Sequence, residues 1–351
     1  MRYGAGAGSS RLVSGTMRIH RRLEERLAEF KGSETALLFG SGYLANTGVV
    51  AALARPGEVV FSDALNHASI VDGCRLAGAE TFVYEHGDLE QLAWGLAEAE
   101  GRGSLIVTDG VFSMDGDVAP LEGIVELARE HDARVMVDDA HGLGTVGPEG
   151  RGAVAAAGLE DEIDVLVGTL GKALGSYGAY VCCTRPMAKL LTNTARTLIF
   201  STAPPPPAVA AAMAALELVC DQARRVDKLA RNARALREAL TDAGVAVPKT
   251  ELETPIVPVV VGEAEAAVAA SERALADGVF AQAIRPPTVP EGGSRLRLAV
   301  MASHTKSELR EAARTIAAAS GERHAAASLA AAGAVADGAR SGVFDGLADA
   351  A

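Results

Sequence analysis

The sequence predicts an α/β fold with a mainly parallel central sheet in a large domain, followed by a smaller C-terminal α+β domain. Three short apolar runs, at 105–107, 135–137 and 165–167, recur at intervals of thirty residues. Helical patterns lie between these runs, as at 121–131. A strand–helix–strand repeat of this length is typical of right-handed crossovers, which join parallel strands.

Shorter elements precede this repeat. Residues 16–31 carry apolar side chains at helical spacing among charges, which predicts an amphipathic helix. The apolar runs 36–39 and 58–61 predict strands, and we expect a helix between them that extends to Leu53. The Gly/Ser-rich stretch 2–15 predicts a loop, because no strand precedes its glycines as a dinucleotide-binding fingerprint requires.

Further elements follow the repeat. The run 179–183 predicts another buried strand, and the four prolines at 204–207 predict a hard break. Residues 208–240 are expected to be largely helical. The stretches 256–261 and 295–300 predict strands of the second domain.

The domain organisation follows from these elements and from the composition. A chain of 351 residues with 49% hydrophobic residues can bury a large core. We expect a large domain at 1–207, a small domain at 208–320, and a poorly ordered Ala/Gly-rich tail without a catalytic role at 321–351.

Charge and cysteine content exclude several classes of protein. The net charge of −12 and the lack of a basic cluster argue against nucleic acid as a partner. No apolar run is long enough to span a membrane. The four cysteines contain no CxxC pair, so we expect free thiols, no metal site and a cytoplasmic enzyme.

Polar residues follow the ends of the three repeated strands. Ser113 comes after the first strand, Asp138 to His141 after the second, and Thr169 and Lys172 after the third. In parallel sheets, ligands bind beyond the carboxyl ends of the strands. The sequence therefore predicts that these residues face one crevice.

Lys172 stands alone among Gly, Ala and Leu at the end of a buried strand. We expect partial desolvation there, which lowers the pKa of a lysine and suits an amine that forms an imine with a carbonyl cofactor. The alternative is a lysine that points into solvent from a loop. A phosphate-binding P-loop is excluded, because only two residues separate Gly168 and Gly171 and because Ala173 follows the lysine.

The same residue types fit pyridoxal 5′-phosphate (PLP), which needs a reactive lysine, a carboxylate and a phosphate site. Asp138 could keep the ring nitrogen of PLP protonated, since a close ion pair is worth roughly 4 kcal/mol at an effective dielectric constant near 20. A turn or cap residue is the alternative for Asp138, and its neighbour Asp139 is expected to be the structural one. The glycines before Tyr43 could begin a phosphate-binding helix or an ordinary capped turn. His67 could stack on a cofactor ring or be a satisfied structural histidine.

Four motifs closely resemble those of the α-oxoamine synthases, which are PLP enzymes of fold type I. These motifs are SDALNHAS at 62–69, TDGVFSMDGD at 108–117, VDDAHGLG at 137–144 and TLGKALG at 169–175. The resemblance covers residues 2–316 and implies a condensation of an amino acid with an acyl-CoA, with loss of CO₂. The stretch 283–300 most resembles members of biotin biosynthesis, which implies L-alanine and pimeloyl-CoA, or a pimeloyl carrier thioester, as substrates.

The resemblance also implies the roles of individual residues. Lys172 matches the Schiff-base lysine that moves the Cα proton, Asp138 the partner of the ring nitrogen, and His67 the stacked histidine that also lies near the substrate. Further cofactor contacts are implied for Gly42, Tyr43, Ser113, His141 and Thr169. Ser113 and His141 match groups near the phenolic oxygen of the cofactor, and His141 is also expected to be catalytic.

Two pairs of residues complete the implied site. Ser201 and Thr202 resemble residues that reach the phosphate from the neighbouring subunit, which implies a homodimer. Arg297 matches the arginine that binds the amino-acid carboxylate, and Thr288 lies in the substrate-contacting loop.

One departure from the family keeps other functions open. The chain starts shortly before the glycine-rich stretch and lacks the segment that precedes it in the family. Either the true start lies upstream, or the protein is shortened, in which case we expect an incompletely closed site and exposed apolar surface. The alternatives are another α-oxoamine synthase, of the glycine C-acetyltransferase type, and an inactive PLP-binding remnant. A plain aminotransferase is a further possibility.

Overall fold

In the computed structural model, residues 4–321 are described, and they divide into two compact units. The first unit contains 4–113 and 117–226, and the second contains 114–116 and 227–321. The predicted tail, apart from Gly321, lies outside the described residues.

The division between the units lies after Val226, whereas the sequence suggested a boundary after residue 207. The difference comes from α9 (Pro206–Asp221), which packs against α1 (Arg18–Lys31) of the first unit. An ion pair joins the two helices, with Arg26 Nε 2.8 Å from Glu217 Oε1. Helix α9 therefore belongs to the first unit by its contacts.

A sheet of seven strands forms the centre of the first unit. Its strands are β1 (Thr35–Phe39), β2 (Val59–Asp63), β3 (Glu80–Tyr84), β4 (Ser104–Asp109), β5 (Arg134–Asp138), β6 (Val165–Thr169) and β7 (Ala179–Cys183). The order across the sheet is β1-β7-β6-β5-β4-β2-β3. Strands β2 to β6 pair in parallel, and β7 runs antiparallel to both β6 and β1. The predicted α/β fold with a mainly parallel sheet is confirmed.

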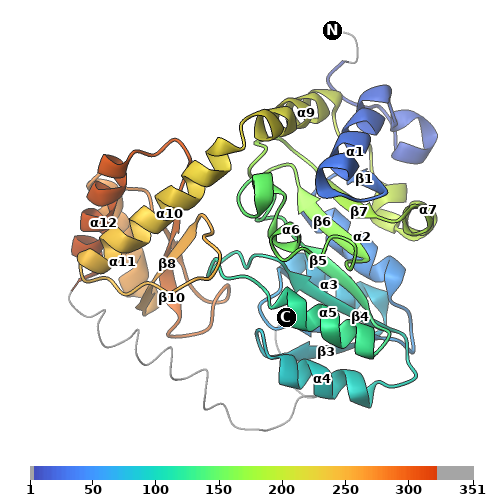
Figure 1. The fold of residues 1–351 in the computed structure, drawn as a ribbon, viewed down its shortest axis with the longest axis horizontal. Coiled ribbons are helices and arrows are strands. Elements are labelled where there is room, and N and C mark those ends of the chain that lie inside the picture. Colours follow the sequence, from blue (N-terminus) through green and yellow to red (C-terminus); the bar gives the residue numbers. More distant parts are fainter. Residues whose placement is uncertain (1–3, 322–351) are drawn as a thin grey trace. The chain divides into compact units, whose positions relative to one another are not determined.

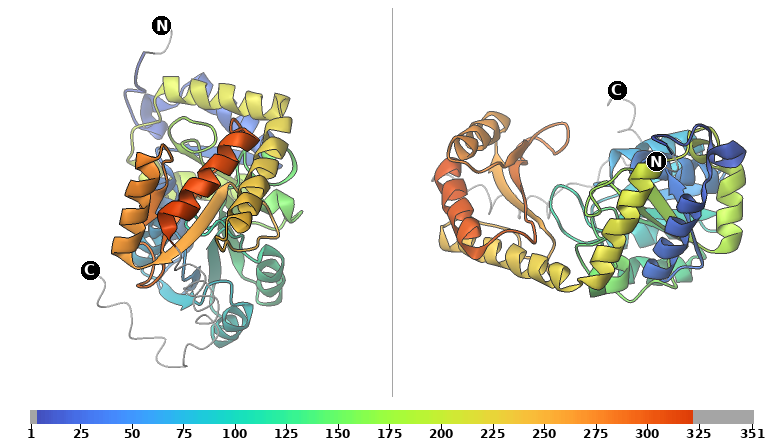
Figure 2. Two further views of the ribbon diagram at one scale, coloured as in Figure 1. Left: turned by 90° about the vertical axis from the view of Figure 1, so that its left-hand side faces the viewer. Right: turned by 90° about the horizontal axis from the view of Figure 1, so that it is seen from above.

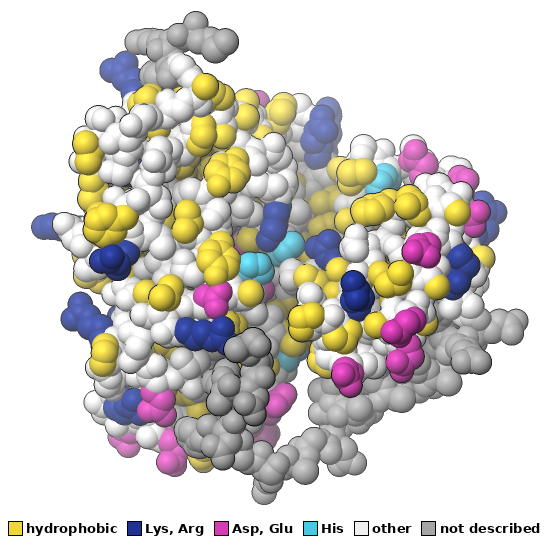
Figure 3. Space-filling view, turned by 180° about the vertical axis from the view of Figure 1, so that it is seen from behind, with side chains coloured by type: hydrophobic (Ala, Val, Ile, Leu, Met, Phe, Trp, Pro, Cys, Tyr) yellow, Lys and Arg dark blue, Asp and Glu magenta, His cyan; other side chains and the backbone are white. Residues whose placement is uncertain are grey.

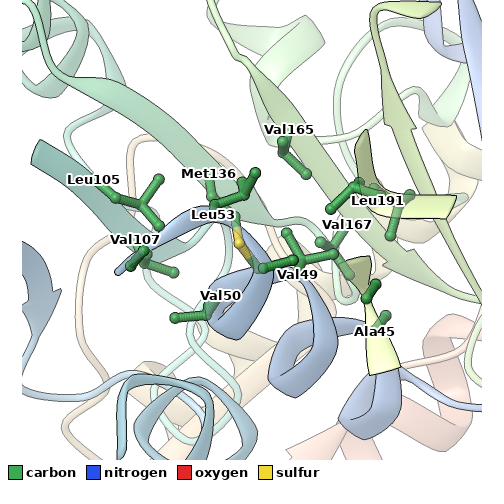
Figure 4. Close-up of a cluster of buried hydrophobic side chains, with 14 of the residues drawn as sticks. Ala45, Val49, Val50, Leu53, Leu105, Val107, Met136, Val165, Val167 and Leu191 are labelled. Atoms are coloured by element: carbon green, nitrogen blue, oxygen red, sulfur yellow. The ribbon is translucent and has the colours of Figure 1, made fainter. Parts of the chain in front are cut away.

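Helices cover both faces of this sheet (Figure 1). They are α2 (Gly42–Leu53), α3 (Ala68–Ala77), α4 (Leu89–Glu98), α5 (Leu121–Glu130), α6 (Ala153–Ala156), α7 (Arg185–Thr194) and α8 (Arg196–Ile199), with a 3-10 turn at Pro148–Gly150. Helix α2 lies at the centre of one face, where Val49 and Leu53 meet the alternate side chains of β4, β5 and β6 (Figure 4). This core fixes the start of α2 relative to the strand ends.

Two segments of the first unit differ from the sequence prediction. The 2–15 stretch is not a plain loop, because Arg11–Gly15 forms a π-helical turn closed by a 2.9 Å hydrogen bond from Gly15 N to Ser10 O. The Arg11 guanidinium holds this turn by donating to Glu24 Oε1 at 2.7 Å and to Leu38 O at 2.9 Å. Strand β3 was not predicted, since it is an edge strand with exposed Glu80 and Val83 rather than an apolar run.

The second unit is built on a three-stranded antiparallel sheet in the order β8-β10-β9. The strands are β8 (Ile256–Gly262), β9 (Gln282–Ile284) and β10 (Ser294–Ala299), and the helices are α10 (Arg224–Asp242), α11 (Ala264–Ala276) and α12 (Lys306–Ser320). Side chains of all three helices share one core with β8 and β10, and the helices lie against the small sheet (Figure 2). The predicted helical stretch 208–240 thus forms two helices. Helix α9 belongs to the first unit, and the side chains of α10 lie in the core of the second unit.

The surface carries scattered hydrophobic side chains among polar atoms (Figure 3). The most exposed of the large ones are Val13, Phe200 and Phe280, at 79%, 71% and 74%. Within residues 4–321, no helix has both the length and the apolar character needed to cross a lipid bilayer.

Candidate active site

The carboxyl ends of four neighbouring strands carry the polar side chains of the candidate site. Strands β2, β4 and β5 end in Asp63, Asp109 and Asp138, and β6 ends in Thr169. Asp109 lies directly opposite Asp138 in the parallel register of β4 and β5. The strand ends therefore form one continuous edge, and the turn that carries Lys172 begins there.

Four ionisable groups act on one another at this edge. Burial raises the pKa of Asp109 well above its ordinary value, and the negative charge of Asp138 raises it further, while the charge of Lys172 lowers it. The pKa of His67 is lowered, mainly by burial. The charge of Lys172 lowers it further, and the charge of Asp138 opposes the change. These effects agree with the strand register, in which Asp109 lies opposite Asp138 and the turn that carries Lys172 follows the neighbouring strand β6.

A chain of hydrogen bonds connects Asp138 to His67. Asn46 Nδ2 donates to Asp138 Oδ2 at 2.6 Å and lies 2.9 Å from Ser69 Oγ. The Ser69 hydroxyl lies 2.7 Å from His67 Nδ1, which also accepts the Ser69 backbone N–H at 3.2 Å. The backbone N–H of Ala140 donates to the other oxygen of Asp138 at 3.0 Å. Because Nδ1 accepts hydrogen bonds, the neutral imidazole carries its proton on Nε2.

The turn after β6 presents Lys172. Thr169 Oγ1 accepts the N–H of Gly171 at 3.2 Å and donates to Gly178 O at 3.1 Å. These two bonds connect the turn to the residue that precedes β7. The expected desolvation of Lys172 is not observed, because its side chain is exposed. The reason is local: glycine and alanine flank the lysine and offer no large side chain to cover it.

The N-terminus of α2 points its first amides at the same region of the first unit. Ser41 caps the helix by accepting the N–H of Leu44 at 3.2 Å. Gly42 and Tyr43 supply first-turn amides, which have no partner inside a helix. A Cβ atom at Gly42 would meet no atom within 4 Å, so there is open space beside the first turn of the helix. The Tyr43 hydroxyl bonds Asp72 on α3.

Asp139 differs from its neighbour Asp138 in its partners. Its carboxylate is fully buried and forms an ion pair with Lys31, with Nζ 2.9 Å from Oδ2. Oδ1 accepts the N–H of Ala153 at 3.1 Å. This geometry ties α1 and α6 to the sheet, which agrees with the structural role expected for Asp139.

The remaining predicted residues of the first unit occupy loops. Ser113 is half-buried in the loop after β4, and His141 is half-buried in the turn after β5. Ser201 and Thr202 follow α8, where Thr202 pairs with Ser10 in an antiparallel bridge.

Two predicted substrate residues belong to the second unit. Arg297 lies on β10 between Pro258 of β8 and Gln282 of β9, and burial lowers the pKa of its guanidinium. Thr288 is exposed in the loop between β9 and β10, where its N–H donates to Arg285 O at 3.1 Å.

Three residues of the edge were absent from the sequence prediction. Asp109 lies at a strand end and inside the 108–117 motif, so its position was a usable signal. Ser69 lies inside the 62–69 motif, which was likewise a usable signal. Asn46 gave no such signal, because its role comes from a contact with Asp138, a residue distant in the chain. Among residues 4–321, no group of three or more His, Cys, Asp or Glu side chains is arranged to hold a metal ion.

Comparisons with known proteins give the family. The sequence model of the family described as "Aminotransferase class I and II" matches residues 1–316. The 8-amino-7-oxononanoate synthase of Geobacter sulfurreducens is 53% identical over 89% of this chain and 80% of that protein. The synthase of Trichlorobacter lovleyi is 51% identical over 90% of the chain and 81% of that protein.

Solved structures agree with this result. A serine palmitoyltransferase solved with a PLP internal aldimine is 36% identical, with a TM-score of 0.87 over 91% of this chain and 80% of that one. The 8-amino-7-oxononanoate synthase of Francisella tularensis is 26% identical, with a TM-score of 0.77 over 90% and 89%. The chain therefore belongs to the class I and II aminotransferase family and, within it, to the PLP-dependent α-oxoamine synthases that include the 8-amino-7-oxononanoate synthases.

Proposed function

We propose that this protein binds PLP and condenses L-alanine with pimeloyl-CoA, giving 8-amino-7-oxononanoate, CoA and CO₂. One structural observation carries the proposal: Asp138 at the end of β5 is linked to His67 through Asn46 and Ser69, and Lys172 lies on the turn after the neighbouring strand β6. An amine and a carboxylate at the same strand ends are what a PLP site requires. The similarity to 8-amino-7-oxononanoate synthases supports the choice of substrates.

The residues at the edge fit the ring end of PLP. Lys172 would carry the cofactor through Nζ, and Asp138 would hold the proton on the ring nitrogen. Asn46 and Ala140 already donate to Asp138, so its carboxylate is fixed in place. His67, whose pKa is lowered mainly by burial, would offer a neutral flat ring for stacking.

The start of α2 fits the phosphate end. The first-turn amides of Gly42 and Tyr43 lie at the positive end of the helix dipole, which favours an anion. Thr169 and the half-buried Ser113 and His141 would contact the cofactor from the strand-end loops.

PLP supplies an electron sink for the negative charge that develops on the substrate carbon. The protein must then move one proton and hold one carboxylate. Lys172, exposed on its turn, would take the proton from the α-carbon of alanine and return one to the product. Arg297 would bind the amino-acid carboxylate as a fork of N–H donors, and the Thr288 loop would contact the acyl substrate.

We propose that the protein works as a homodimer in which Ser201 and Thr202 reach the partner's phosphate. The exposed Phe200 precedes this pair directly. Leu12 and Val13, exposed at 52% and 79%, lie in the π-helical turn that contacts α8. An apolar surface next to the predicted shared residues supports an interface there.

The test is a CoA-release assay over paired amino acids and acyl-CoAs, together with absorption spectra. We expect CoA release that requires both alanine and pimeloyl-CoA, and a visible absorption band of lysine-bound PLP. Lys172→Ala should lose both the band and the turnover. Lys189→Ala, which changes an exposed lysine on α7, should keep both.

Other outcomes of the same assay would replace the proposal. Equal CoA release with glycine plus acetyl-CoA or succinyl-CoA would assign a different α-oxoamine synthase activity. The band without any turnover would mean a PLP-binding protein that does not catalyse the reaction. Pyridoxamine phosphate formed with alanine alone would indicate an aminotransferase.

A further inference from the structure

His86, which follows β3, forms ion pairs with two carboxylates. Its Nδ1 lies 3.0 Å from Asp63 Oδ1, and its Nε2 lies 2.7 Å from Asp117 Oδ2. The imidazole also meets the edge of the Phe112 ring, with centroids 4.4 Å apart and an interplanar angle of 83°. Both ring nitrogens thus face acceptors, which only a doubly protonated histidine can satisfy.

The first carboxylate belongs to the loop that leads to His67. Asp63 ends β2 and is buried, and its Oδ1 accepts the N–H of Leu65 at 2.8 Å. Its Oδ2 accepts the N–H of Gly87 at 3.0 Å. Asp63 therefore shapes the 63–67 turn while it holds the segment that carries His86.

The second carboxylate closes the loop that carries Ser113. The backbone O of Asp117 accepts the N–H of Phe112 at 2.9 Å, and Val111 pairs with Val118 in an antiparallel bridge. Asp117 Oδ1 is buried and has no hydrogen-bond partner among the described residues. His86 is thus the side chain that balances the charge of Asp117 in this loop.

We propose that His86, held as a cation between Asp63 and Asp117, is a positioning residue that joins the loop of His67 to the loop of Ser113. Neither loop is a helix or a strand: the first is a turn, and the second is closed by the Val111–Val118 bridge and by the hydrogen bond from Phe112 N to Asp117 O. The imidazolium of His86, shared by Asp63 and Asp117, sets the distance between the two loops. This inference rests on the proposed PLP site, because His67 and Ser113 matter only if a cofactor lies there.

The surroundings of the imidazole favour its protonated form. Burial disfavours the cation, but the hydrogen bonds and charges of Asp117 and Asp63 outweigh it and raise the pKa of His86 from 6.5 to about 10. The other titratable groups nearby are Tyr84 at the end of β3 and Asp109 at the end of β4, and both interact with Asp63. Glu85 and Asp88 flank it in sequence. None of these neighbours adds a positive charge.

The sign of the pH dependence follows from this raised pKa. A histidine with a higher pKa in the folded state stabilises that state fully below pH 6.5 and loses this contribution as the pH rises through about 10. The connection between the loops should therefore persist at neutral pH and weaken in the alkaline range.

The direct test is an NMR titration of the full-length, PLP-loaded protein with labelled histidine. The chain has seven histidines, so His86→Gln identifies the resonance by its disappearance. We expect one imidazole that stays doubly protonated up to about pH 10 and is missing in His86→Gln. A His86 resonance that titrates near 6.5 would overturn the proposal.

The functional test compares His86→Gln and Asp117→Asn with His131→Gln, a histidine at the end of α5 whose side chain has no ion pair or hydrogen bond in the described structure. We expect the PLP affinity and the turnover rate of the first two variants each to fall by about 10- to 100-fold at neutral pH. A loss of this size is typical when a contact that supports a site is removed. The KM for alanine should stay unchanged, since Arg297 is on another unit. The double variant should lose little more than either single variant.

The controls separate this inference from the proposed function. If His86→Gln is poorly folded, Asp117→Asn still tests the proposal, because it removes the charge of the Asp117 carboxylate and leaves the imidazole of His86 in place. PLP affinity of both variants equal to that of the unmodified protein would overturn the inference. A protein that shows a protonated His86 but binds no PLP would instead overturn the proposed function.

Discussion

At the scale of single residues, Asn46 connects two parts of the edge. Its amide donates to Asp138 and lies beside Ser69, so one side chain orients both the carboxylate and, through Ser69, the imidazole of His67. Asn46, Ser69 and Asp138 are buried, so the contacts among them are costly to lose.

We therefore expect Asn46→Ala to weaken PLP binding. A hydrogen bond to a charged group contributes about 1.5–3 kcal/mol, which corresponds to roughly 10- to 100-fold in affinity. Spectroscopic titration with PLP measures the change. Asn193→Ala on the exposed face of α7 is the matched control and should bind PLP normally. Equal affinities for the two variants would show that Asp138 needs no support from Asn46.

At the scale of elements, α2 combines two tasks. Its start offers the amides of Gly42 and Tyr43, its second turn carries Asn46, and its buried side packs against three strands (Figure 4). Its position is also fixed from outside, because Thr197 of α8 donates to Leu44 O at 2.6 Å across Gly48. The site therefore depends on how closely α2 and α8 approach.

Gly48→Ala tests this close approach. The added methyl group would lie 1.9 Å from Thr197 Oγ1, so α8 or the threonine must shift. Overpacking costs about 1–3 kcal/mol, against about 1 kcal/mol gained from the better helix propensity of alanine. We expect a net loss of up to about 2 kcal/mol in the free energy of unfolding, measured with urea.

A second variant separates the steric effect from other causes. Thr197→Ala removes the clashing oxygen, so Gly48→Ala in that background should cost less than in the native protein. Strictly additive losses would show that the contact between Gly48 and Thr197 does not limit the packing.

At the scale of the whole molecule, the proposed dimer can be tested at one exposed ring. Phe200 is 71% exposed next to Ser201 and Thr202. Phe200→Glu should shift the protein towards monomers and weaken PLP binding, because a buried charge in an interface is unfavourable and each site would lose the partner's hydroxyls. Sedimentation velocity measures the association state.

Phe280→Glu is the control for this change. Phe280 is equally exposed, at 74%, but lies in the second unit. It should leave association and PLP binding unaffected. If Phe200→Glu remains a dimer with normal PLP affinity, the interface lies elsewhere on the surface.

The sequence by itself determined the class of fold and most of its elements. Apolar runs of buried strands and helical spacing are local patterns, so β4, β5, β6 and their crossovers could be predicted from them. The strand-end rule then placed Asp138, Thr169 and Lys172 at one edge, since it depends only on strand direction. Edge strand β3 escaped prediction because its exposed side has no apolar pattern.

Only the tertiary structure decided how the edge is held together. The bond from Asn46 to Asp138 spans 92 residues, and the ion pairs of His86 join three segments. The tertiary structure also decided that α9 belongs to the first unit. Such contacts form between side chains that are far apart in the sequence and come together only when the helices pack on the sheet. A local sequence pattern therefore cannot predict them.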